Sequence, residues 1–183
     1  MTPRHVILTG MPGAGKTCVG RSLARILGRE FVDLDREITR LRGRTPAEIL
    51  REEGEETFRG FEVDALEDVL EREGPLVVAL GGGTVVTEAA RRRLDSEFVV
   101  FLDVDLGELV ARVAPAGSAG RPLLGEDVIA SMGELLERRR PWYRETATVT
   151  VDADARPDAV ALGVLSALAG VTDATTDAAG VER

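Results

Sequence analysis

Short apolar runs alternate with amphipathic stretches along nearly the whole chain. The runs predict five strands, at residues 6–8, 30–32, 76–80, 98–102 and 148–151. The third and fourth runs are almost continuously apolar, which is typical of parallel strands covered on both faces. The amphipathic stretches predict helices, at residues 16–27, 37–42, 46 to about 72, 106–113, 128–139 and 158–168.

Local signals mark the ends of several helices. Gly28 ends the first, Thr45 followed by Pro46 suits an N-cap with a first-turn proline, and Gly54 weakens the long helix that follows. Strands that alternate with helices predict an α/β fold, with one open parallel sheet flanked by helices. Residues 1–169 are predicted to form one domain. Residues 170–183 are rich in Thr, Ala, Asp and Gly and are predicted to be a disordered tail.

Composition narrows the possible function classes. The chain has 183 residues, of which 44% are hydrophobic and 30% charged, and its net charge is −9 at pH 7. This acidic balance disfavours nucleic acid or an anionic membrane as a main partner. No apolar run is long enough for a membrane-spanning helix or a secretory signal. One cysteine and one histidine exclude an internal disulfide and a structural zinc site, so we expect a cytoplasmic protein, and a monomer because no long apolar helix face stands out.

The basic residues draw attention to one segment. Of the 23 basic side chains, 22 are arginines, and the single lysine is Lys16. It lies in the sequence Gly-Met-Pro-Gly-Ala-Gly-Lys-Thr at residues 10–17, which matches the phosphate-binding pattern G-x-x-x-x-G-K-[ST]. The match follows a predicted strand and opens a predicted helix, which is the context that this pattern requires. We refer to residues 10–17 as the phosphate loop.

The phosphate loop predicts a binding site for a nucleoside triphosphate. Lys16 would reach the β- and γ-phosphates, and the Thr17 hydroxyl would hold Mg²⁺. The side chain of Cys18 is expected to be a small packing residue, so that only its backbone N–H matters. The backbone N–H groups expected to surround the phosphate oxygens at the helix N-terminus belong to Gly13, Ala14, Gly15, Lys16, Thr17 and Cys18.

Two carboxylates follow the second predicted strand, where the binding crevice of an open α/β sheet is expected. Asp33 and Asp35 are two residues apart, so in an extended segment they would point to the same side. One carboxylate could then bind the water molecules around the metal, while the other contacts a hydroxyl of the molecule that accepts the phosphoryl group. A helix N-cap motif explains the pair equally well, and the sequence leaves both interpretations open.

Further candidates lie after the third strand and in the second half of the chain. Three glycines, Gly81–Gly82–Gly83, follow the third strand, and they suit either close ligand approach or a flexible turn. Arg59 with Glu62 is, taken alone, an ordinary pair on a helix surface. The small residues 114–120 predict a mobile loop, and arginines beside it, such as Arg121, suit closure over phosphates. Arginines 138 and 140 could simply be solvated.

Taken in order, these segments resemble one family. The phosphate loop, Asp-x-Asp, Gly-Glu-x-x-Phe-Arg-x-x-Glu, Gly-Gly-Gly, Arg-Pro-Leu-Leu and Arg-x-Pro-x-Tyr are similar to the motifs of shikimate kinases, from about residue 6 to about residue 168. The resemblance implies a P-loop kinase fold with a five-stranded parallel sheet, a helical substrate-binding region and a mobile lid at about residues 114–125. It also implies transfer of the ATP γ-phosphoryl group to the 3-hydroxyl of shikimate, a step of chorismate and aromatic amino acid biosynthesis.

The resemblance also implies residue roles. Asp35 would bind the acceptor hydroxyls and act as the base, and Asp33 would lie near the Mg²⁺ shell. Arg59 and Arg139 would hold the shikimate carboxylate, while the backbone of Gly81, Gly82 and Gly83 would border the ring. Arg121 would act on the ATP phosphates from the lid, and Arg156 would contact the nucleotide on the adenine side. The catalytic set implied is Lys16, Asp33, Asp35 and Arg121.

Three other interpretations of the sequence compete with this one. Another small-metabolite kinase, of the gluconate or nucleoside monophosphate type, would share the phosphate loop but not Phe58–Arg59, the three glycines, or Arg139 with Pro141. A GTPase switch would normally need asparagine and a second lysine for base recognition, and the chain has neither. An inactive relative that serves as an interaction module gains no support, because every catalytic-type position is filled.

Overall fold

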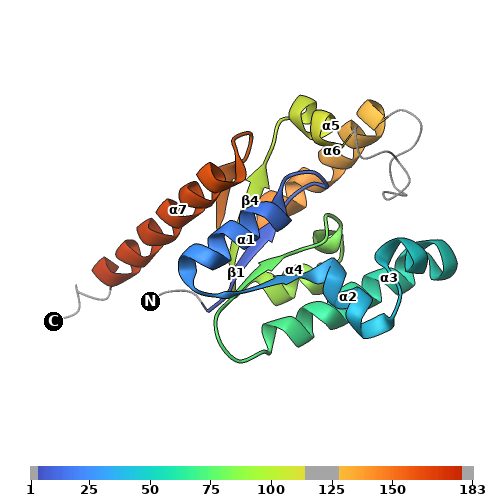
Figure 1. Cartoon of the computed structure of the whole chain (residues 1–183), viewed down its shortest axis with the longest axis horizontal. Coiled ribbons are helices and arrows are strands. Elements are labelled where there is room, and N and C mark those ends of the chain that lie inside the picture. Colours follow the sequence, from blue (N-terminus) through green and yellow to red (C-terminus); the bar gives the residue numbers. More distant parts are fainter. Residues whose placement is uncertain (1–3, 114–127, 179–183) are drawn as a thin grey trace.

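The computed structural model describes residues 4–113 and 128–178, and within them it contains one five-stranded parallel sheet (Figure 1). The strand order is β2-β3-β1-β4-β5, and every neighbouring pair is parallel. The strands are β1 (Val6–Thr9), β2 (Glu30–Asp33), β3 (Leu76–Ala79), β4 (Phe98–Asp103) and β5 (Val149–Asp152). The fold class predicted from the sequence is confirmed.

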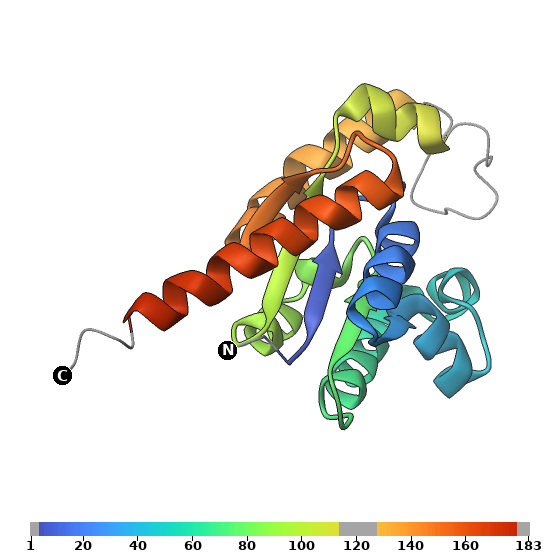
Figure 2. The same ribbon diagram turned by 60° about the vertical axis from the view of Figure 1, so that its left-hand side comes forward.

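Seven α-helices and one short 3₁₀ helix connect and flank these strands within the described residues. They are α1 (Lys16–Leu27), α2 (Leu34–Arg42), α3 (Pro46–Leu70), η1 (Thr84–Val86), α4 (Glu88–Leu94), α5 (Leu106–Val113), α6 (Val128–Thr146) and α7 (Pro157–Ala178). Helices α1 and α7 lie side by side over one part of the sheet, as Figure 2 shows. None of the described helices is both long and apolar enough to cross a membrane.

Alternation along the central strands builds two apolar cores. In β1, Ile7 packs with α2, α3 and α4, whereas its neighbours Val6 and Leu8 pack with α1 and α7. Val77 and Val78 of β3 divide between the two cores in the same way. Because successive side chains of a strand point to opposite faces, a fully apolar strand must be covered on both sides. This explains why the central runs are continuously apolar.

The helix signals read from the sequence operate as expected at α3. The Thr45 side chain accepts a hydrogen bond from the Glu48 N–H, and the Glu48 carboxylate accepts one from the Thr45 N–H, which forms a capping box. Gly54 has φ 85° and ψ 173°, so it breaks the helical path inside α3. The second part of α3, which carries Arg59, is therefore a separate helical segment that starts after a kink.

Helix α4 (Glu88–Leu94) lies in a segment for which no helix range was predicted, and three of the predicted helices differ in their bounds. Helix α2 begins at Leu34, directly after β2, because the Asp33 side chain caps it. Helix α6 continues through Pro141 to Thr146, although proline lacks the N–H that would bond one turn back. Helix α7 continues to Ala178, beyond the predicted helix end at residue 168. Residues 179–183 lie outside the described part of the chain.

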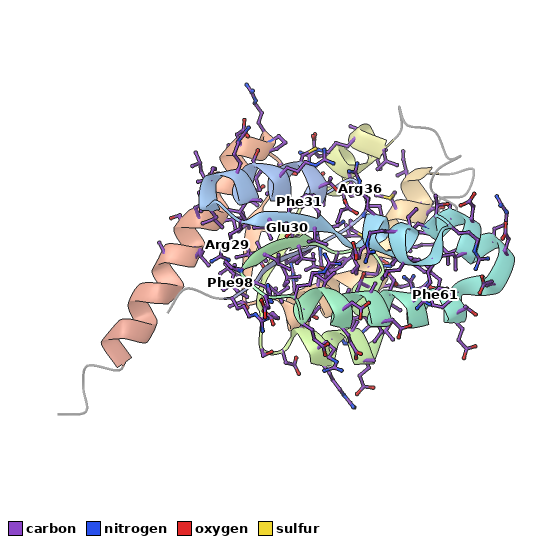
Figure 3. The ribbon with its side chains drawn as sticks, turned by 60° about the horizontal axis from the view of Figure 1, so that its bottom comes forward. Arg29, Glu30, Phe31, Arg36, Phe61 and Phe98 are labelled. Atoms are coloured by element: carbon purple, nitrogen blue, oxygen red, sulfur yellow. The ribbon has the colours of Figure 1, made fainter. Side chains whose placement is uncertain are left out.

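One close contact fixes the first helix over the edge of the sheet. Phe31 of β2 lies beneath α1 (Figure 3), and its ring occupies the space that a Cβ atom on Gly20 would need. Gly20 is buried, and its missing side chain lets α1 approach strand β2. This approach sets the position of the phosphate loop, which enters α1 directly.

The single histidine ties β1 to the connection between α3 and β3. His5 is fully buried; its Nδ1 accepts a hydrogen bond from the Leu76 N–H, and its Nε2 lies 3.2 Å from the Leu70 carbonyl oxygen. Nδ1 can accept only when it carries no proton, so the neutral imidazole fits this site. Burial is the main cause that lowers the pKa of His5, and the nearby Arg4 and Arg29 also lower it, against an opposite effect of Glu97.

The lowered pKa of His5 predicts a loss of stability in mild acid. The unfolded chain takes up a proton near pH 6.5 while the folded chain resists it, so the unfolding free energy falls as the pH drops below about 6.5. The share from this group is at most about 2 kcal/mol at pH 5. His5→Asn keeps an acceptor but does not titrate, so its unfolding free energy should fall less between pH 7 and 5. Equal pH slopes for the two proteins in urea unfolding would contradict this.

Candidate active site

A crevice of about 720 Å³ lies at the edge where the parallel strands end. The phosphate loop forms one wall, and the segments that follow β2, β3 and β5 contribute others. Its lining residues include Lys16, Asp33, Asp35, Gly82, Arg112 and Arg156. In open α/β sheets this edge is where ligands bind, because the connecting loops diverge there.

The phosphate loop has the backbone conformation that its glycines allow. Gly13 and Gly15 have φ values of 86° and 88°, in the left-handed region that residues with a side chain rarely adopt. No side chain caps the start of α1 at Gly15, so its first N–H groups face the crevice as an anion site. The Lys16 ammonium donates to the carbonyl oxygens of Gly10 and Met11, at 2.8 and 2.9 Å. These bonds hold the Lys16 side chain against the phosphate loop.

Cys18 lines the same crevice from the first turn of α1. Its side chain is exposed, so the packing role expected from the sequence is not observed. Its backbone N–H remains part of the helix start that faces the crevice.

Thr17 and Asp33 join the phosphate loop to the end of β2. The Thr17 hydroxyl donates to the Asp33 carboxylate at 2.8 Å. The other carboxylate oxygen of Asp33 accepts from the Arg36 N–H and caps α2. A hydroxyl and a carboxylate are hard oxygen donors of the kind that Mg²⁺ takes alongside waters and phosphates. Among the described residues, no group of three or more His, Cys, Asp or Glu side chains could hold a metal ion.

Asp35 reaches the crevice from the start of a helix. The sequence left open whether Asp33 and Asp35 share a side of an extended segment or mark a helix start, and the structure has the helix start. Asp35 lies in the first turn of α2 and points toward Gly81. Burial is the main cause that raises the pKa of the Asp35 carboxyl, and Asp33 raises it further, while Lys16 and Arg59 oppose the shift. A raised pKa makes this carboxylate a better proton acceptor.

The three glycines after β3 lie close to charged side chains from helices α2, α3 and α6. We refer to residues 81–83 as the glycine turn. A Cβ atom on Gly81 would lie 2.8 Å from the Asp35 carboxylate, and one on Gly83 would lie 2.5 Å from the Arg59 guanidinium. The carbonyl oxygen of Gly82 accepts a hydrogen bond from Arg139 at 3.0 Å. The missing side chains of Gly81 and Gly83 thus leave room for carboxylate and guanidinium groups directly against the turn.

Arg59 is held by a buried network rather than by a surface pair. It donates to Glu62, which is only 1% exposed, and to Glu55 at 2.9 Å. Glu62 also accepts from the Thr84 hydroxyl at 2.8 Å. Burial raises the pKa of Glu62 against the opposing effects of Arg59 and Thr84. The sequence could not distinguish this pair from a solvated one, because the i,i+3 spacing is the same in both.

The far end of the crevice is formed by α5 and the segment after β5. Arg112 donates to the carbonyl oxygens of Ala153 and Asp154, at 3.1 and 3.2 Å, and pairs with Glu108. These bonds hold the segment that carries Arg156, whose exposed side chain lines the crevice. Arg121 and the predicted lid at residues 114–125 lie outside the described residues.

Comparison with known proteins decides the family. The shikimate kinase family model matches residues 12–169. The chain belongs to the shikimate kinase family. It is therefore an ATP-dependent kinase, and the family's reaction is the phosphorylation of shikimate.

The matches to individual relatives extend over nearly the full length of the chain. A shikimate kinase of Salinispora arenicola is 43% identical over 164 residues, which is 89% of this chain and 96% of that protein. One of Mycobacterium ulcerans is 39% identical over 179 residues, 96% of this chain and 95% of that protein. A solved shikimate kinase of Acinetobacter baumannii in complex with shikimate matches with a TM-score of 0.87 and 36% identity, covering 92% of this chain and 94% of that chain. A gluconokinase of Sinorhizobium meliloti, 22% identical with a TM-score of 0.69, shares the fold.

The structure adds residues to the site that sequence reasoning did not assign. Glu62 and Thr84 support Arg59, Arg112 supports the segment of Arg156, and Tyr143 donates to the Gly82 carbonyl. Glu62 and Tyr143 stood inside the quoted motifs, but nothing in the sequence indicated their partners. Arg112 gave only an i,i+4 spacing to Glu108, which is common on helix surfaces.

The contact between Gly83 and Arg59 predicts a selective defect. Gly83 has φ −111°, which alanine can adopt, but the added methyl group of Gly83→Ala would displace the Arg59 guanidinium. We expect the KM for shikimate to rise at least about tenfold, the KM for ATP to stay within about twofold, and the melting temperature to change little. Gly60→Ala is the matched control, since its Cβ meets nothing within 4 Å. Steady-state kinetics in which both variants behave alike would contradict this placement of Arg59.

Proposed function

We propose that the enzyme binds ATP with Mg²⁺ on the phosphate loop and transfers the γ-phosphoryl group to the 3-hydroxyl of shikimate. The products are shikimate 3-phosphate and ADP. The observation that carries this proposal is the arrangement at the glycine turn. Asp35, Arg139 and Arg59 lie against three consecutive residues of this turn, in that order. A carboxylate beside two guanidinium groups suits an acceptor with hydroxyls at one end and a carboxylate at the other.

The nucleotide side supplies positive charge and orientation. The N–H groups of residues 13–18 surround the β- and γ-phosphates, and Lys16 neutralises charge on them. Arg156 contacts the adenine side, at the end of the crevice that Arg112 supports. Arg121 acts on the transferring phosphoryl group from the lid, as in the family that the chain resembles. These groups supply what phosphoryl transfer needs most, which is placement and charge stabilisation.

Thr17 and Asp33 are the residues that hold Mg²⁺ in this proposal. Their mutual hydrogen bond places a hydroxyl and a carboxylate together beside the phosphate loop. When bound, the ion neutralises charge on the β- and γ-phosphate oxygens.

On the acceptor side, Arg59 and Arg139 hold the carboxylate of shikimate, and the backbone of residues 81–83 borders the ring. Asp35 accepts a hydrogen bond from the 3-hydroxyl and takes its proton as the oxygen bonds to the γ-phosphorus. The bond from that phosphorus to the bridging oxygen breaks, and its electron pair leaves with ADP. The raised pKa of Asp35 supports its role as the base, because burial makes its carboxylate more basic.

The proposal also includes a cytoplasmic monomer without a nucleic-acid or membrane partner. The net charge of −9 supports this, because like charge repels anionic polymers and surfaces. Among the described residues, the most exposed large apolar side chains are divided among four helices, α1, α2, α6 and α7. They are Ile26, Leu41, Ile129 and Leu162.

The acceptor is tested by ADP release with MgATP and four alternative acceptors, namely shikimate, quinate, gluconate and AMP. We expect kcat/KM for shikimate to exceed that for each of the others by at least about a hundredfold, because AMP lacks the carboxylate, and quinate and gluconate carry their carboxylate and hydroxyls on carbon frames of a different shape. Faster turnover of gluconate or AMP would favour the other small-metabolite kinases and overturn the acceptor assignment.

The base is tested by Asp35→Asn, which removes the proton acceptor but keeps the size of the side chain. We expect kcat to fall about 10²–10⁴-fold, while the affinity for ATP, measured by calorimetry, stays within about threefold. Asp95→Asn, at an exposed position at the end of α4, is the control and should keep the wild-type kcat. A kcat for Asp35→Asn within about threefold of the wild type would exclude Asp35 as the base.

A further inference from the structure

One backbone oxygen, the carbonyl of Gly82, receives two donors from a single helix. Arg139 donates to it at 3.0 Å, and the hydroxyl of Tyr143 donates to it as well. Both donors lie on α6 and are four residues apart, so they share one face of that helix. This arrangement needs α6 to continue through Pro141, which lies between them and is exposed.

The surroundings of Tyr143 leave its hydroxyl little freedom. The ring is fully buried and stacks on Phe101, with the ring centroids 5.1 Å apart and the planes 20° apart. The hydroxyl also lies 3.7 Å from the sulfur of Met11, in the phosphate loop. Burial raises the pKa of Tyr143 to about 12, so the phenol keeps its proton and remains a donor at working pH.

The Gly82 peptide is confined on its other side by the phosphate loop. A Cβ atom on Gly82 would lie 2.7 Å from the Cδ atom of Pro12, so the two backbones are in close contact. The peptide is therefore enclosed between Pro12 and α6. Its carbonyl oxygen has two lone pairs, and Arg139 and Tyr143 together use both.

We propose that Tyr143 is a positioning residue for the acceptor site: its hydroxyl fixes the Gly82 carbonyl, which in turn orients the guanidinium of Arg139. The proposal rests on the proposed function, in which Arg139 binds the acceptor carboxylate. Tyr143 is not among the residues that line the crevice. Without its hydroxyl the carbonyl keeps one donor, the peptide can tilt, and the anchor of Arg139 moves with it.

Tyr143→Phe removes the hydroxyl and keeps the ring that stacks on Phe101. We expect the dissociation constant and the KM for shikimate to rise about tenfold, because a displaced guanidinium loses a two-bond contact with a carboxylate. The KM for ATP and kcat at saturating shikimate should stay within about twofold. A change in melting temperature with an unchanged shikimate KM would show a purely structural tyrosine and overturn the proposal.

Phe101→Leu is the matched control, because it removes the aromatic stack but leaves the hydroxyl. Its melting temperature should fall, as for other truncated core residues, while the KM for shikimate stays within about twofold. If Phe101→Leu raises the shikimate KM as much as Tyr143→Phe does, packing rather than the hydroxyl positions the site, and the proposal is wrong.

A double-mutant cycle shows whether Tyr143 acts through Arg139. Arg139→Lys replaces the planar fork by a single ammonium. In that background, Tyr143→Phe should change the shikimate dissociation constant less than about twofold, since the orientation of a fork no longer matters. Independent, multiplying losses would overturn the proposal. Wild-type turnover in the same assay separates the outcomes: failure of the wild type to phosphorylate shikimate would instead refute the proposed function.

Discussion

The five parallel strands all end at the same edge of the sheet, and the active site depends on this common direction. The end of β1 continues into the phosphate loop, β2 ends at Asp33, β3 leads into the glycine turn, and β5 leads to Arg156. Segments that are far apart in the sequence thus line one crevice. An antiparallel sheet would send half of them to the opposite edge. The two apolar cores matter to function because they keep the strands in this register.

Close approach of backbone and side chains is the second constraint. The glycine turn has no side chains, so charged groups lie directly against its backbone, and Gly82 also packs against Pro12. Charged groups at this depth need partners, because an unpaired buried charge is strongly unfavourable. Arg59 has Glu62, and Glu62 has Thr84 in addition. A pair of this kind contributes little to stability when compared with apolar residues of the same size, but it fixes where the guanidinium lies.

Most of the fold could be predicted from the sequence because its signals are local. The strand runs, the helix start at Thr45 and Pro46 and the weak point at Gly54 depend on neighbouring residues, and all three predictions are confirmed. An element that depends on a distant partner was predicted less well. Helix α6 continues past Pro141, where the buried ring of Tyr143 packs on Phe101. In this case the local preference for ending a helix did not decide the outcome.

The sequence by itself determined the phosphate loop, the order of strands and helices along the chain, and the motif set that the shikimate kinase family shares. These depend on short patterns in which the residue type and the spacing carry the chemistry. Only the tertiary structure decided that Asp35 faces Gly81, that Arg59 and Glu62 are buried, and that Arg139 and Tyr143 meet at one carbonyl oxygen. The physical reason is that burial and hydrogen bonding between distant segments arise when the sheet and helices pack, and no local pattern encodes which partner a side chain will find.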